Sequence, residues 1–390
     1  MNFVSQVANA HAASRSRSGG HVPRVDERGL NFARSVKCLG ISRGNFGDAA
    51  STARERYPDQ PTVEAILKGS ISSGSTSSGN WAADLVGEET SAFADFVEFL
   101  RPMTILGKFG VGGVPSLRRV PFRVPLISQT GGGSGYWVGE GKPKPLTNFD
   151  FERTTLTPLK VANIAVVTME LLRDSSPSAD LILRDSLAAA LKERLDTDFI
   201  DPAKGVSAGV SPASILNGVT PITSTGNDAA DIREDIRLLF AAFIAANNAP
   251  TSGVWIMAAT TALSISLMQN PLGQAEFPGI SMMGGTLFGL PAIVSEYVPS
   301  VTSGSYVALV NASDIYLGDE GGIAVDLSRE ASLEMADDPT NDSVTPTATA
   351  MVSMFQTNSV AFRCERTVNF KRRRDSAVAY LDAVNWGAAS

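Results

Sequence analysis

The most informative segment of this 390-residue chain is VPFRVPLISQTGGGSGYWVGEGKPKPLTNFDFERTTLTPLK, residues 120–160. From Val120 to Leu126, apolar residues alternate with Pro and Arg, which is the period of a β-strand. The prolines in this run favour an edge ribbon over a central strand. A glycine-rich stretch follows, and extended character resumes after Phe149. We therefore predict that residues 118–160 form a long two-stranded arm with a flexible tip.

The tip of this arm has more than one interpretation. The stretch GGGSGYWVGEGK, residues 131–142, invites comparison with a phosphate-binding loop, but such a loop would need Gly in place of Tyr136 and Ser or Thr in place of Pro143. We expect a docking surface for another copy of the chain, because apolar positions on an isolated ribbon would otherwise stay in water. An ordinary loop is the alternative. The predicted docking residues are Tyr136, Trp137, Lys142 and Lys144.

The clearest helix follows the arm. Ser176 is a good N-cap, and Pro177 suits the first helical position. Leucines then recur every four residues until Asp201-Pro202 ends the pattern, which predicts a helix of about 24 residues, or ~36 Å. Its buried stripe is predicted to consist of Leu183, Leu187, Leu191 and Leu195.

The N-terminal part differs from the rest in charge. Residues 1–68 carry a net charge of +4, whereas residues 205–350 carry −12. Short apolar patterns predict small helices in this part, and the Gly/Ser-rich stretch 71–81 predicts a linker. Its first arginines are candidates for contact with nucleic acid, with a solvated tail as the alternative; they are Arg15, Arg17, Arg24 and Arg28. Because so short a helix is marginal alone, another subunit is expected to contact Phe32, Val36 and Leu39.

The second half of the chain alternates helices and strands, which indicates an α/β or α+β unit. Within 206–345, helices are predicted around 232–244 and 259–269, and strands near 253–257, 291–298, 305–310 and 322–327. One very long strand is predicted at 350–370 and a last strand at 377–384. Between them, the basic run from Lys371 to Arg374 is expected to protect a strand end, with contact to nucleic acid as the less common alternative.

Composition excludes several function classes. With 33 Lys and Arg against 40 Asp and Glu, the net charge is −7, so the whole chain is not a basic nucleic-acid binder. Two histidines and two cysteines rule out a zinc site at ligand spacing, and a catalytic triad would need His11 or His21. The apolar run 238–246 is too short to span a membrane. We therefore expect a non-enzyme with no cofactor, no metal and no membrane partner.

The order of these parts resembles the tailed-phage major capsid protein family, whose fold is named after phage Hong Kong 97. FLRPMTILGKFG (99–110) looks like the family's N-arm, 120–176 like its extended loop and return strand, and 176–202 like its spine helix. Segments similar to its axial domain are GVSPASILNGVTP (209–221), WIMAATTALSISLMQNPLGQAEFPG (255–279) and GTLFGLPAIVSEYVP (285–299). MFQTNSVAFRCERTVNFKRRRDSAVAYL (354–381) resembles the closing strands of its peripheral domain.

The resemblance implies an α+β capsid fold with six parts. The long spine helix and long β-strands belong to a peripheral domain, and the extended loop is a β-hairpin. The expected parts are a basic scaffold-like or inner-wall segment with its linker (1–78), an N-arm (79–117), the extended loop (118–160), the peripheral domain with the spine helix (161–205), an axial α/β domain (206–348) and the closing peripheral strands (349–390).

The resemblance also implies a function. It is that of a shell protein of the virion, assembled in the host cytoplasm as hexamers and pentamers into an icosahedral head around packaged double-stranded DNA. Implied partners are further copies, the portal protein, and scaffolding, decoration or protease proteins. No lysine cross-link is expected, because no matching asparagine or glutamate is found. The alternative is an encapsulin-like compartment shell of the same fold; the basic segment 1–68 favours the DNA container.

Overall fold

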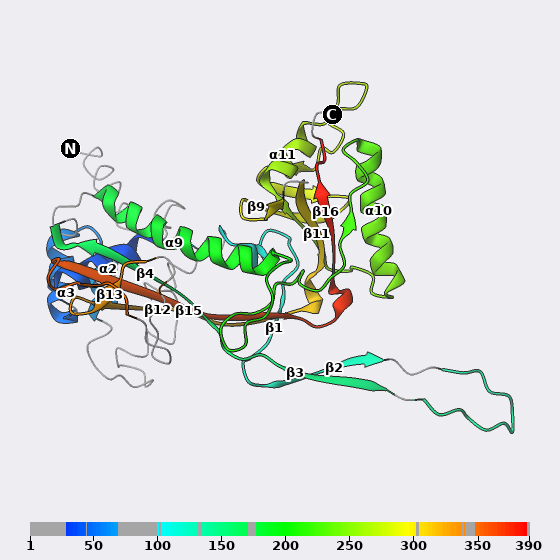
Figure 1. The fold of residues 1–390 in the computed structure, drawn as a ribbon, viewed down its shortest axis with the longest axis horizontal. Coiled ribbons are helices and arrows are strands. Elements are labelled where there is room, and N and C mark those ends of the chain that lie inside the picture. The colour runs from blue at the N-terminus through cyan, green and yellow to red at the C-terminus, as the bar shows by residue number, and fades with distance from the viewer. Residues whose placement is uncertain are drawn as a thin grey trace, which may run out of the picture.

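The computed structural model describes residues 29–43, 45–68, 100, 103–131, 135–147, 149–170, 177–301, 304–336, 339 and 348–387. These residues form two lobes and one projecting arm (Figure 1). We call the lobes the long-strand lobe, which is built on a four-stranded sheet, and the eight-strand lobe, which is built on an eight-stranded sheet. The arm leaves the body near the joint between the lobes.

The long-strand lobe has the strand order β1–β12–β15–β4. In it, β15 (Ser359–Arg372) is antiparallel to β12 (Ile315–Ser328) and to β4 (Lys160–Thr168), and β1 (Arg118–Arg119) is parallel to β12. Alternate side chains of β15, among them Phe362 and Cys364, are buried beneath helix α9 (Pro177–Ile200). The predicted 24-residue helix is thus confirmed, and the predicted long strand begins at 359 because a turn occupies 354–358.

The eight-strand lobe is a sheet with a different apolar cluster on each face. On one face, α10 (Ala229–Ala245) and α11 (Ala259–Leu267) pack against Trp255 and Leu309. On the other face, Ile256 packs in a cluster with Phe199 from the end of α9. The strands, in order, are β5 (Ile222–Thr223), β16 (Val378–Val384), β11 (Gly304–Asn311), β6 (Gly253–Ala258), β9 (Leu290–Ser295), β8 (Gly284–Leu287) and β7 (Ile280–Ser281), with β10 (Ser300–Val301) paired to β11.

Two strands are separated in the structure from the segments with which the sequence analysis grouped them. β12 falls within the predicted axial domain (206–348) but pairs with β15 in the four-stranded sheet. β16 falls within the predicted closing peripheral strands (349–390) but lies between β5 and β11 in the eight-stranded sheet. The chain therefore crosses between the lobes through η3 (Ala312–Asp314) and again around η4 (Asp375–Ala377). An alternating pattern specifies which face of a strand is buried, but not which strand is its neighbour.

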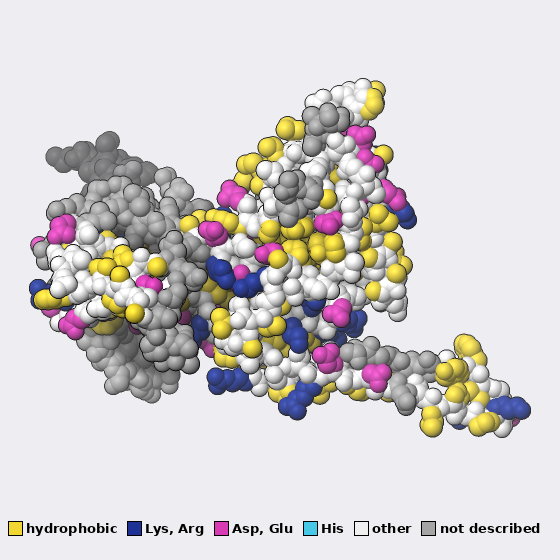
Figure 2. All heavy atoms as spheres, in the orientation of Figure 1, with side chains coloured by type: hydrophobic (Ala, Val, Ile, Leu, Met, Phe, Trp, Pro, Cys, Tyr) yellow, Lys and Arg dark blue, Asp and Glu magenta, His cyan; other side chains and the backbone are white. Residues whose placement is uncertain are grey.

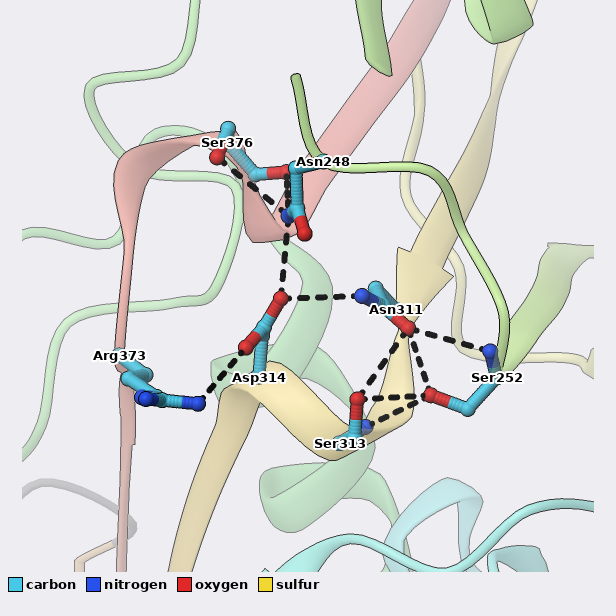
Figure 3. A network of polar contacts seen from close by, with 7 residues as sticks. All are labelled: Asn248, Ser252, Asn311, Ser313, Asp314, Arg373 and Ser376. Carbon is cyan, nitrogen blue, oxygen red and sulfur yellow. Dashed lines mark hydrogen bonds and ion pairs between the residues drawn. The ribbon is translucent and has the colours of Figure 1, made fainter. Parts of the chain in front are cut away.

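A buried polar network holds the two crossings together (Figure 3). Asp314, which is 4% exposed, accepts hydrogen bonds from Asn248 Nδ2 at 3.0 Å and Asn311 Nδ2 at 2.9 Å. The guanidinium of Arg373 lies 3.5 Å from the same carboxylate, and the Arg373 backbone N–H donates to the Asp314 carbonyl at 2.8 Å. Because unpairing such buried groups is costly, this network fixes one crossing against the other.

Three helices near the N-terminus pack on the long-strand lobe. They are α2 (Leu30–Ile41), α3 (Phe46–Arg56) and α4 (Pro61–Lys68), which confirms the predicted small helices. Phe32 and Val36 are 1% and 3% exposed and lie in the cluster of Leu191 and Phe362. The expectation that they contact another subunit is therefore wrong, because they complete the chain's own core. Leu39 packs within the helices themselves.

Candidate assembly surfaces

The arm carries the largest unpartnered ribbon in the described part of the chain. Its strands β2 (Pro125–Gly131) and β3 (Asp150–Thr155) pair antiparallel, with Ile127 opposite Arg153 and Gln129 opposite Phe151. Ile127 and Phe151 therefore share one face of the ribbon. They are 71% and 64% exposed, so this face, which also carries Arg153, presents two large apolar side chains to solvent in the isolated chain. A ribbon of this kind needs a covering surface.

The far end of the arm carries the four predicted docking residues. Tyr136 is 61% exposed and Trp137 is fully exposed, and Leu146, later in the same segment, is also exposed. The lysines at 142 and 144 are exposed in the same segment. Hydrophobic side chains gather at this end with positive charge beside them (Figure 2). The predicted arm is thus confirmed as a feature of the fold, and docking through its tip stays a prediction.

The base of the arm is held firmly against the body. The Arg123 backbone N–H donates to the Leu156 carbonyl at 2.8 Å, and Lys371 Nζ donates to Thr154 Oγ1 at 2.6 Å. The Phe122 ring lies against Gly318 of β12, where a side-chain Cβ would come within 2.5 Å of the ring. A larger residue at position 318 would require the Phe122 ring to shift, so close packing here helps to hold the root of the arm.

The basic run at 371–374 is used mostly inside the chain. Arg372 donates to the carbonyls of Ile215 and Asn217, at 3.2 and 2.9 Å, and Arg373 contacts Asp314. Burial lowers the pKa of Arg372 from its ordinary value. These contacts hold a loop of the eight-strand lobe and the chain crossing in place, which favours a structural role for the run over contact with nucleic acid.

Sequence reasoning missed a buried carboxylate on α9. Asp196 is completely buried, and it accepts hydrogen bonds at 2.7 Å from the Ile105 backbone N–H and from Ser295 Oγ. Burial raises its pKa to about 6, against the opposing effect of these hydrogen bonds. Asp196 thereby joins α9 to α7 (Ile105–Lys108) and to the end of β9. One signal for this residue was present in the sequence, because the acidic residue directly follows Leu195, which was predicted to lie in the core.

Further exposed apolar side chains lie on the eight-strand lobe. Leu263 and Leu267, one turn apart on α11, are 41% and 69% exposed. Leu272 and Met283, in the segments that follow, are more than 80% exposed. No such exposure was predicted, because an apolar residue on a helix also suits a buried core. These side chains are further candidates for contact with another protein.

The remaining predicted site residues divide into two groups. Leu191 and Leu195 are 1% and 2% exposed, which confirms their place in the core. The side chains of Leu183 and Leu187, and the N-terminal arginines Arg15, Arg17, Arg24 and Arg28, lie outside the described residues.

Across the described ranges, no cluster of three acidic, His or Cys side chains is arranged to hold a metal ion. None of the described helices has the length and apolarity to cross a bilayer.

The described residues thus combine a long sheet with an overlying helix, a second α/β lobe and a projecting ribbon. The phage capsid family matches residues 121–383. The chain belongs to the phage capsid family. The match confirms that the chain is a phage capsid component, in agreement with the resemblance drawn from the sequence. This family is one of structural proteins, in keeping with the expected non-enzyme.

Individual relatives agree with the family match. The chain is 66% identical over 368 residues to the capsid polyprotein of Pseudomonas phage PAJU2, which covers 93% of this chain but 55% of the relative, so the chain spans about half the length of that protein. It is 22% identical to the major capsid protein of Klebsiella oxytoca phage phiKO2, over 78% of this chain and 69% of the relative.

Solved structures support the fold. Chains from Mycobacterium phage Ogopogo and Mycobacterium phage Bobi match with TM-scores of 0.53 and 0.52, at 18% and 14% identity. The matches cover 72% and 77% of this chain and 91% and 96% of those chains. At this identity the likeness concerns the fold alone, and it agrees with the mixed helix-and-sheet capsid fold expected from the sequence.

Proposed function

We propose that copies of this chain assemble as hexamers and pentamers into the icosahedral head of a tailed phage, around double-stranded DNA. The observation that carries this proposal is the arm, whose side chains Ile127, Phe151 and Trp137 are largely exposed in the described part of the chain. A second copy of the chain is the partner that a shell would supply. The rigid root of the arm suits it to lie across a neighbour at a defined angle.

Charge favours a container for nucleic acid. The acidic stretch 205–350 would repel DNA, so a genome could move along the wall without binding tightly. Non-specific contact with DNA would then fall to the basic N-terminal part. Assembly takes place in the host cytoplasm, and the portal protein, scaffolding, decoration and protease proteins are the further partners we propose.

Electron microscopy of purified particles tests the function directly. We expect closed icosahedral shells, filled with DNA when isolated from virions. Shells of the same fold that hold an enzyme and no DNA would instead identify an encapsulin-like compartment. Chains that never form shells under any assembly condition would contradict both the phage head and the encapsulin-like compartment.

A pair of variants tests the role of the arm tip. Deleting 131–142 shortens the arm, whereas replacing these residues by an equally long Gly/Ser segment keeps its length and removes the side chains. We expect folded subunits that fail to give stable shells in both cases. If the Gly/Ser variant forms shells with the thermal stability of the wild type, the tip side chains do not dock.

A further inference from the structure

The helices α2–α4 lie outside the matched range of the phage capsid family, residues 121–383, yet they form part of the core. We infer that residues 30–68 are a permanent part of the capsid subunit, seated on α9 and β15, and not a removable scaffold. This inference rests on the proposed shell function, because it concerns what the mature shell retains. It replaces the sequence-based expectation of a tethered element separate from the subunit.

The seat of these helices is an apolar surface of the long-strand lobe. Phe32 and Val36 of α2 share one cluster with Leu191 of α9 and with Val360 and Phe362 of β15. All five side chains are at most 3% exposed. Removing α2 would therefore open the middle of this core to water, which is unfavourable for each of the exposed side chains.

The three helices also form a unit of their own. Ala49 and Ala53 of α3, Val63 and Leu67 of α4, and Cys38 of α2 make a second buried cluster. Every one of these side chains is at most 1% exposed. α2 thus contributes one side to the lobe core and another to the helical cluster. We therefore expect the three helices to bind the lobe as a single unit.

The helices are also joined by polar contacts. Arg34 of α2 hydrogen-bonds to Gln60 and stacks over the Tyr57 ring at 5.1 Å. Glu64 of α4 pairs with Arg54 of α3, and the outward face of α3 carries exposed charges such as Glu55. The apolar side of this unit is buried against the lobe and its charged side faces solvent. Detaching the unit would expose the apolar side to water, so we expect it to remain bound.

A cut in the chain would not release this unit. Cleavage N-terminal to Leu30 leaves the core contacts intact. Cleavage between Lys68 and Leu100 breaks the covalent link but none of the contacts of Phe32 and Val36. In both cases we expect residues 30–68 to stay bound in the shell, as part of the subunit or as a separate peptide.

Mass spectrometry of DNA-filled particles is the first test. We expect peptides from 30–68 at a one-to-one ratio with peptides from 177–301. Stable, DNA-filled particles that lack 30–68 would overturn the inference while leaving the capsid function intact. Absence of shells altogether would count against the function itself, so the two failures are distinguishable.

A matched set of substitutions is the second test. In the unassembled full-length chain, Phe32→Ala is expected to lower Tm by roughly 5–10 °C, and Thr62→Ala, on the exposed side of α4, to leave it unchanged. If Phe32→Ala is insoluble, Phe32→Leu, which keeps most of the volume, should be soluble with an intermediate Tm. A Phe32→Ala chain with the Tm of the wild type would refute the seat.

Discussion

The substitution Asp196→Asn should remove a pH dependence from the stability of the subunit. Asp196 lies buried between α9, α7 and β9, where it accepts hydrogen bonds from Ile105 N–H and Ser295 Oγ. Lys108 and Lys192 are the nearby cations, and they favour the ionised form without overcoming the effect of burial. Asparagine keeps an acceptor for Ile105 N–H and offers a donor to Ser295, so the geometry can persist without the charge.

The sign follows from the two pKa values of this carboxyl group. It is about 6 in the folded chain and 3.8 for the unperturbed side chain. Below pH 3.8 the group is protonated in both states and contributes nothing. Between these values the unfolded chain loses the proton first, so the free energy of unfolding falls as pH rises. Above pH 6 the free energy of unfolding falls no further on account of this group. A difference of two pKa units corresponds to a total decrease of about 3 kcal/mol.

The measurement is denaturant unfolding of the unassembled chain from pH 4 to pH 8. We expect Asp196→Asn to be more stable than the wild type at pH 7, by at most about 3 kcal/mol, with the difference shrinking toward pH 4. Glu193→Gln, at an exposed position on the same helix, serves as control and should give no such trend. A difference between Asp196→Asn and the wild type that stays constant with pH would refute the reasoning.

Three further outcomes are expected. Ile127→Ser with Phe151→Ser should leave the Tm of the free subunit within error and lower the denaturant concentration at which shells dissociate, since these side chains are more than 60% exposed before assembly; shells of unchanged resistance would contradict a docked arm face. Leu191→Asp should cost several kcal/mol by burying an unpaired charge, and soluble, monodisperse shells from that variant would contradict its core position. Asp314→Ala should lower the free energy of unfolding by about 3–5 kcal/mol, because it leaves buried donors unpaired, whereas Asp375→Ala, whose side chain is fully exposed, should change it by less than ~0.5 kcal/mol in the same denaturant titration.

The sequence could predict those elements whose formation depends on residues close together in the chain. The helix at 177–200 could be predicted because the leucine spacing and Pro177 lie within it and Asp201-Pro202 follows it directly. The arm could be predicted because a ribbon with prolines and a glycine-rich tip cannot occupy the centre of a sheet. The pairing of β12 with β15 and of β16 with β11 could not be predicted, since each strand pairs with a partner more than thirty residues away in the sequence. The burial of Asp196 also depends on segments distant in sequence, at 105 and 295.

The joint between the lobes limits how a shell of this protein can adapt. One apolar cluster contains Val310 of the eight-stranded sheet, Phe370 of the four-stranded sheet and Phe199 of α9, so it spans both lobes. The Asp314 network fixes the two chain crossings at the same place. Opening this joint would expose apolar surface and unpair buried polar groups together, so the lobes should move as one body. In the proposed shell, subunits in hexamers and pentamers meet at different angles. The arm beyond its root projects away from both lobes (Figure 1), and we therefore expect the difference in angle to be taken up there.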